Sequence, residues 1–154
     1  MKAIKKILVP TDFSSTSREA VKLACQLAQL NSARLILFHV IPLVNLYDIN
    51  AISAYQNVEE EIYTDLKKVS QRKMHELQVK IGQDFPSIEV GIEIKDRFDE
   101  SDGILDAARE HQVDLIVIGS HGRKGINRIL MGSVAETVLR HASCDVLVYK
   151  HYVK

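Results

Sequence analysis

Short apolar runs alternate with amphipathic segments along this chain. Residues 7–9, 35–38 and 115–118 contain no polar side chain, which is typical of strands buried on both faces of a sheet. Between these runs, apolar residues recur every three or four positions, the spacing that places them on one face of a helix. Continuous apolar strands separated by helices indicate an α/β fold with a buried parallel sheet.

The same pattern predicts the order of the elements. We expect strands at 7–10, 34–40, 88–94, 114–118 and 144–150. We expect four helices: one that begins near 16, one that begins near 58, and two that span 104–111 and 133–141. The alternation of apolar and polar residues at 88–94 is that of a half-exposed strand at an edge. Residues 41–57 show no clear period and are expected to form a long connection, and the acidic residues 96–102 a loop.

Several local features of these elements are also predicted. In the helix near 58, one face is predicted to carry the apolar residues Val58, Ile62, Leu66, Val69, Leu77 and Ile81. Thr16 with Glu19, and Ser133 with Glu136, have the spacing of a capping box at a helix start. In addition, we expect His39 to be a hydrogen-bonded core histidine, and Cys25 and Cys144 to be small buried residues.

Composition narrows the class of protein. The chain has 154 residues, of which 46% are hydrophobic and 26% charged, so we expect one globular domain covering residues 1–154. Its 20 basic and 20 acidic residues give a formal net charge of zero, which disfavours nucleic acid and anionic membranes as partners. The sequence shows neither the apolar core of a signal peptide nor a membrane-length apolar stretch, and we expect a cytoplasmic protein.

The loop after the fourth predicted strand carries the candidate chemistry. GSHGRKGINRILMGS, residues 119–133, holds four glycines, three cationic side chains and no acid. Glycines allow a ligand to approach the backbone, and a helix N-terminus provides N–H groups that suit phosphate. The chain contains neither the P-loop pattern GxxxxGK[ST] nor GxGxxG after a strand, so we expect an anion site of another type.

The spacing Gly119-x2-Gly122-x9-Gly132-Ser133 resembles the nucleotide-binding motif of the universal stress protein family. ILVPTDFS, LILFHVI, DLIVIGSHGR and CDVLVYK are also similar to that family, so the resemblance covers essentially the whole chain. It implies a five-stranded parallel sheet of order 3-2-1-4-5 with helices on both faces, a Rossmann-like fold. Ligands of such sheets bind beyond the carboxyl ends of the strands, where the strand order reverses.

The resemblance also implies a set of ligand-binding residues. Asp12 and the backbone near Val40 would meet the adenine and ribose, with Pro10 and Thr11 counted in the same site. The ribose and phosphates would be held by the glycine motif, by two loop side chains and by backbone N–H groups of the following helix, a set that comprises Gly119, His121, Gly122, Arg123, Gly132, Ser133, Val134 and Ala135.

The hypothesis favoured at this point is a small cytoplasmic regulatory protein of the stress response that binds ATP, alone or with Mg²⁺, with little or no turnover. No catalytic triad or metal-ligand spacing is visible in the sequence, and no catalytic or metal-binding residue is assigned. Two alternatives stay open, a slow ATPase or phosphotransfer enzyme using Asp12 and Mg²⁺, and a nucleotide-free dimeric scaffold. The last strand would lie at a sheet edge, and universal stress proteins commonly dimerise through it, so we expect a homodimer.

Overall fold

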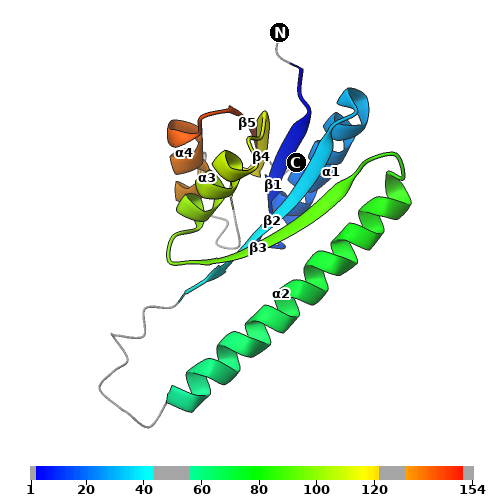
Figure 1. The fold of residues 1–154 in the computed structure, drawn as a ribbon. Coiled ribbons are helices and arrows are strands. Elements are labelled where there is room, and N and C mark those ends of the chain that lie inside the picture. The colour runs from blue at the N-terminus through cyan, green and yellow to red at the C-terminus, as the bar shows by residue number, and fades with distance from the viewer. Residues whose placement is uncertain (1–2, 44–55, 122–130, 151–154) are drawn as a thin grey trace.

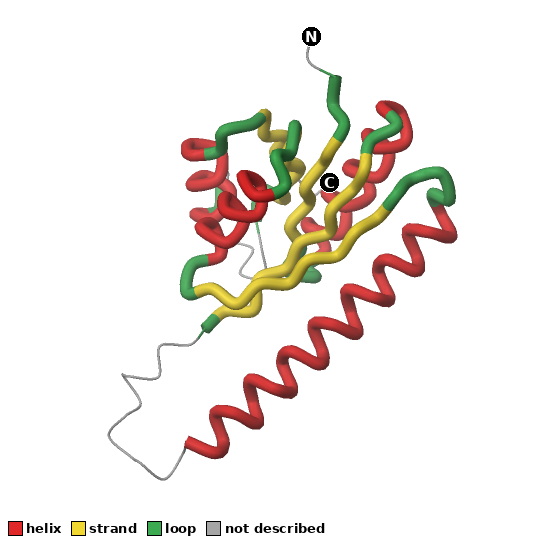
Figure 2. The backbone as a smooth tube through the Cα atoms, in the orientation of Figure 1, coloured by secondary structure: helices red, strands yellow, loops and turns green. Residues whose placement is uncertain are grey.

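Five parallel strands form one sheet in the order β3-β2-β1-β4-β5, the order that the family resemblance implies. The computed structural model describes residues 3–43, 56–121 and 131–150, and for 56–60 only the course of the backbone. Figure 2 shows the strands at the centre of the molecule and the helices outside them. The strands are β1 (Lys6–Pro10), β2 (Arg34–Pro42), β3 (Val90–Arg97), β4 (Leu115–Gly119) and β5 (Asp145–Tyr149).

Two helices cover each face of the sheet (Figure 1). α1 (Ser15–Asn31) and α2 (Gln56–Asp84) cover one face, and α3 (Glu100–Glu110) and α4 (Ser133–His141) the other. Side chains alternate along each strand, so odd-numbered residues of β1, β2 and β4 pack under α1 and α2 while even-numbered ones pack under α3 and α4. Each central strand therefore contributes to two apolar cores, which explains its unbroken apolar sequence.

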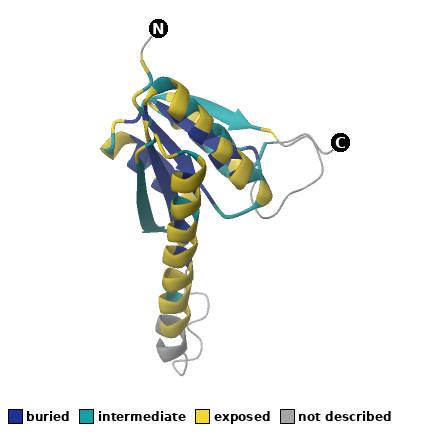
Figure 3. Ribbon diagram, turned by 90° about the vertical axis from the view of Figure 1, so that its right-hand side faces the viewer, coloured by how far each residue is buried: buried dark blue, intermediate teal, exposed yellow. Residues whose placement is uncertain are grey.

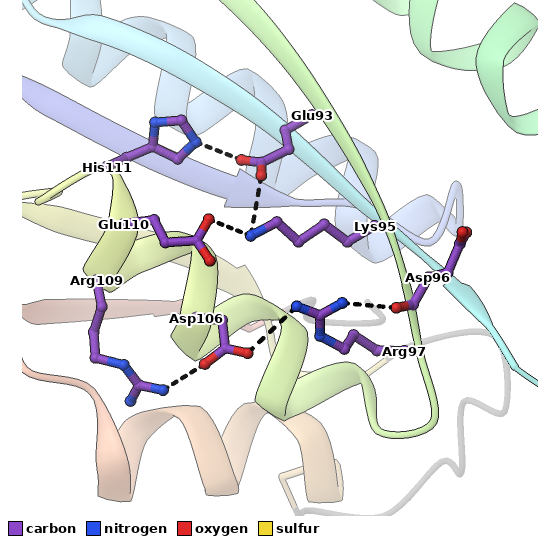
Figure 4. Close-up of polar contacts among 8 residues, drawn as sticks. All are labelled: Glu93, Lys95, Asp96, Arg97, Asp106, Arg109, Glu110 and His111. Carbon is purple, nitrogen blue, oxygen red and sulfur yellow. Dashed lines mark hydrogen bonds and ion pairs between the residues drawn. The ribbon is translucent and has the colours of Figure 1, made fainter.

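The edge strand β3 has a different character on each face. Ile92 and Ile94 pack into the core beneath α2. On the other face, Lys95 Nζ lies 3.2 Å from Glu93 Oε1 and also pairs with Glu110 of α3, as Figure 4 shows. The predicted edge strand is confirmed, but it begins at Val90 and not at Ile88, and its polar face is joined to α3 by the ion pair between Lys95 and Glu110.

Some predicted boundaries are wrong. Ser14, and not Thr16, caps α1, because its side chain accepts a hydrogen bond from Ser17 N–H. Residues 96–102 do not form a loop, since β3 continues to Arg97 and Asp99 caps α3 through the N–H groups of the first helical turn. β2 extends into the expected connection as far as Pro42, and residues 44–55 lie outside the described part of the chain.

The face predicted for α2 is only partly buried. Ile81 is 4% exposed, whereas Ile62 and Leu66 are 56% and 45% exposed. Figures 1 and 3 show the reason, because the N-terminal end of α2 projects beyond the sheet. Periodicity identifies the helix correctly, but the length of the neighbouring strands decides how much of its apolar face is covered.

Candidate functional site

A cleft opens at the carboxyl ends of the strands, between β1 and β4. These two strands pair at Ile7↔Leu115 and Leu8↔Ile116, and the helices that follow them along the chain, α1 and α4, cover opposite faces of the sheet. This is the point where the strand order reverses, the usual place for a ligand in an open α/β sheet. A cavity of about 900 Å³ lies there, a volume in the range of small-molecule sites.

The structure brings most of the sequence-predicted residues to this cavity. Gly122 and Arg123 lie outside the described residues. The other ten predicted residues line the cavity, namely Pro10, Thr11, Asp12, Val40, Gly119, His121, Gly132, Ser133, Val134 and Ala135. Their clustering follows from the fold, since they come from the ends of β1, β2 and β4 and from the first turn of α4.

The turn after β1 fixes Thr11 and Asp12 at the edge of the cleft. Thr11 is 4% exposed, its N–H donates to Phe38 O at 2.8 Å, and its Oγ1 lies 3.1 Å from Ser17 Oγ. Asp12 Oδ1 accepts a hydrogen bond from Ser14 N–H at 3.0 Å. This local bond is that of an Asx turn, so Asp12 orders the turn that also presents its carboxylate to the cavity.

Val40 presents a backbone edge to the cleft. The N–H of Arg34 and the C=O of Phe38 form their hydrogen bonds on the β1 side of β2. The backbone groups of the even-numbered β2 residues therefore face β1. The ladder between β1 and β2 ends at the pair Pro10↔Phe38. Val40 lies two residues further along β2, and its N–H and C=O therefore face a gap that β1 no longer fills.

The N-terminus of α4 closes the other end of the cavity. The predicted capping box of Ser133 and Glu136 is wrong, because Gly132 is the cap residue, without a side-chain hydrogen bond, and Glu136 pairs with Arg140. Ser133 is instead the first helical residue and its side chain is exposed. The first turn has no intrahelical acceptor for its N–H groups, so the donors of 133–135 lie at the cavity wall.

The two glycines of the motif that lie in the described residues have packing roles. A Cβ on Gly119 would come within 3.1 Å of Thr16 Cγ2, and one on Gly132 within 3.1 Å of Ser120 O. Gly132 has φ −65° and ψ 150°, in the β region, so it needs no left-handed conformation. Each of these glycines therefore allows two chain segments to approach closely, in addition to the ligand access expected from the sequence.

His121 has one ring nitrogen bonded and one without a partner. Its Nδ1 lies 3.0 Å from Ser120 Oγ, and its buried Nε2 has no hydrogen-bond partner within the part of the chain described here. Buried polar atoms are normally satisfied. Because His121 also lines the cavity, its imidazole is a candidate partner for a polar ligand.

Sequence reasoning missed other residues of the cavity wall. His39 was assigned to the core and does bond there through both ring nitrogens, but it also lines the cavity, as do Ser70 of α2 and Glu100 of α3. Ser120 could have been found from its place inside the glycine loop. No local pattern identifies Ser70 or Glu100, because helix packing brings them to the cleft.

The described residues contain no cluster of three or more His, Cys, Asp or Glu side chains that could hold a metal ion. Among the described helices, none combines the length and apolar character that crossing a bilayer requires.

Comparison with known proteins agrees with this geometry. The model of the universal stress protein family matches residues 3–150. Universal stress protein MJ0531 of Methanocaldococcus jannaschii is 34% identical over 153 residues, covering 95% of this chain and 82% of the relative. The structure of universal stress protein UspA from Lactobacillus plantarum superposes with a TM-score of 0.84 at 26% identity, covering 97% of this chain and 99% of that one.

A third comparison concerns a ligand complex. The crystal structure of a universal stress protein in complex with cAMP has a TM-score of 0.61 and 24% identity to this chain, covering 98% of this chain and all of that one. At this identity the likeness establishes the shared fold alone.

Proposed function

Because the chain belongs to the universal stress protein family, we propose that it is a regulatory protein that binds an adenine nucleotide, ATP in particular, in the cleft between β1 and β4. One observation carries the proposal. A single cavity has an open peptide edge at Val40 on one side and the open N-terminal turn of α4 on the other. An open peptide edge can pair with an adenine base, and the free N–H groups of a helix N-terminus can bind phosphate.

The Val40 edge suits an adenine ring. The Watson–Crick edge of adenine carries an N6 amino donor beside the N1 acceptor, which complements a peptide C=O and N–H that face the same way. Stacking and apolar contact are available from Ile104 and Ile118, which lie on the same cavity wall. Asp12, at the neighbouring turn, is placed to accept hydrogen bonds from the ribose hydroxyls.

The α4 end suits phosphate. Helix N-termini carry a partial positive charge and unpaired N–H groups, which together bind anions. The N–H groups of Ser133, Val134 and Ala135 meet this description, and the unsatisfied Nε2 of His121 adds a further polar contact. Mg²⁺, which usually binds through one or two carboxylates and the phosphates themselves, would find Asp12 and Glu100 at the cavity wall.

The decisive experiment removes one backbone donor without disturbing the helix. Ser133→Pro eliminates the N–H at the first helical position, where proline is favoured, and Gly132 already has the extended ψ of 150° that a residue before proline prefers. A hydrogen bond to a charged group contributes about 1.5–3 kcal/mol, so we expect ATP affinity to fall about tenfold or more in isothermal titration calorimetry. Ser133→Ala keeps the N–H and serves as the matched control.

The outcomes separate the hypotheses. If the folded Ser133→Pro protein binds ATP as tightly as Ser133→Ala, the phosphates do not bind at α4. If the wild-type protein binds no adenine nucleotide, the nucleotide-free scaffold becomes the better explanation. Phosphate release over hours, abolished by Asp12→Asn, would indicate the slow ATPase instead.

We further propose that the protein is a homodimer paired through β5, the strand at the edge opposite β3. Tyr149 O accepts a hydrogen bond from Ser120 N–H on the β4 side, so the backbone groups of Val146 and Val148 face outward. An unpaired row of such groups is a template for a second strand. A two-fold axis would satisfy both copies at once. The cytoplasm stays our predicted location.

A further inference from the structure

His39 joins three elements beside the cleft. The residue lies near the end of β2 and is 6% exposed. Its Nδ1 is 2.7 Å from the carbonyl oxygen of Thr11 in the turn after β1, and its Nε2 is 3.2 Å from Ser70 Oγ in α2. The ring also contacts Phe13, with 4.6 Å between ring centroids.

The chemistry of these partners determines which nitrogen carries the proton. A carbonyl oxygen can only accept a hydrogen bond, so Nδ1 must be protonated and donate to Thr11 O. In the neutral ring, Nε2 is then the acceptor and the Ser70 hydroxyl is the donor. The Ser70 hydroxyl can donate or accept, so its contact is compatible with the tautomer that the contact with Thr11 needs.

We propose that His39 is a positioning residue of the nucleotide site, an inference that rests on the proposed function. Thr11 is already held at its N–H by Phe38 and at its hydroxyl by Ser17, and His39 fixes its remaining polar group, the carbonyl. That carbonyl shares a planar peptide group with the N–H of Asp12. His39 thus sets the orientation of the peptide that leads into the ligand-facing turn, and Ser70 ties that orientation to α2.

Two substitutions separate the two ring nitrogens. His39→Asn places an amide N–H near the position of Nδ1, so it can still donate to Thr11 O but does not reach Ser70. His39→Gln reaches toward Ser70 and leaves Thr11 O without its donor. Both remove the ring, so both lose a similar share of the packing contribution, which urea unfolding measures.

The expected difference lies in nucleotide affinity. When a fraction of molecules has a misoriented turn, the apparent Kd rises in inverse proportion to the competent fraction. We expect ATP to bind His39→Asn within about twofold of wild type and His39→Gln about five- to tenfold more weakly, the effect of one lost hydrogen bond. Equal affinities in the two variants, with wild type binding ATP, would overturn the role of His39, whereas a wild-type protein that binds no nucleotide refutes the proposed function itself.

A spectroscopic measurement on the wild type covers the case in which a variant does not fold. ¹⁵N–¹H correlation of the imidazole nitrogens distinguishes the two tautomers. We expect His39 to carry a proton on Nδ1. A ring protonated only at Nε2 would contradict the hydrogen bond to Thr11 O, and with it the inference.

Discussion

Gly103 in α3 offers a direct test of how closely this helix packs on the sheet. A Cβ added there would lie 2.9 Å from Val40 Cγ2 and 3.2 Å from Arg97 Cγ. Arg97 has a long side chain that can move aside, but Val40 is 7% exposed and β-branched, which restricts its rotamers. Overpacking of this kind typically costs about 1–3 kcal/mol.

A second effect acts in the opposite direction. Alanine is favoured over glycine inside a helix by about 1 kcal/mol, so Gly103→Ala should lower the free energy of unfolding by a net amount of up to about 2 kcal/mol. For a chain of this length 1 kcal/mol corresponds to roughly 2–4 °C in Tm. The displaced Val40 should also weaken ATP binding, because its backbone forms one side of the cleft.

Gly82 in α2 provides the matched control. Apart from its chain neighbours and the backbone of its own helix, no atom of the described residues lies within 4 Å of a Cβ built on this glycine. Gly82→Ala should therefore keep the helix-propensity gain and raise the stability by up to about 1 kcal/mol. Thermal and urea unfolding of the two variants should therefore change in opposite directions. If Gly103→Ala stabilises the protein as much as Gly82→Ala does, the close contact between α3 and β2 is wrong.

Three further predictions concern other parts of the molecule. Asp99 caps α3, and its hydrogen bonds, first that from the Ser101 hydroxyl, hold the pKa of its carboxyl below the usual range. Asp99→Ala should therefore lower the free energy of unfolding by about 1 kcal/mol, an effect that is complete above about pH 4, the unfolded pKa, and shrinks as the pH falls through the lower folded pKa. A difference in urea unfolding that is undiminished at pH 2 would contradict this role. Burial, with a smaller contribution from the charge of Asp84, raises the pKa of the Cys25 thiol to about 12, so iodoacetamide at pH 8 should label this residue only after unfolding. Rapid labelling of the native protein, detected by mass spectrometry, would refute the burial. In sedimentation equilibrium the wild type should have twice the 17.4 kDa chain mass, whereas Val148→Pro, which removes an outward-facing N–H of β5 and spares the bonds to β4, should be shifted toward monomer. A wild-type protein that is monomeric at tens of micromolar contradicts the proposed dimer.

The sequence alone determined the fold class and indicated where in the fold the candidate site lies. Continuous apolar runs identify central strands because both of their faces are buried, and the predicted helix at 133–141 has the observed bounds. The glycine loop could be assigned to the ligand-binding end because it follows a strand, and the carboxyl ends of parallel strands meet at one edge of the sheet. These features depend on local periodicity and chain order, which a sequence records directly.

Only the tertiary structure decided the contacts between distant residues. It showed that Gly132 is bounded by the backbone of Ser120, that Asp99 and Ser14 are the true caps, and that His39 bonds to Thr11 and Ser70. A glycine has the same sequence signature whether it admits a phosphate or a neighbouring backbone. Which of the two it meets depends on how helices and strands pack, and packing depends on side chains far apart in the chain.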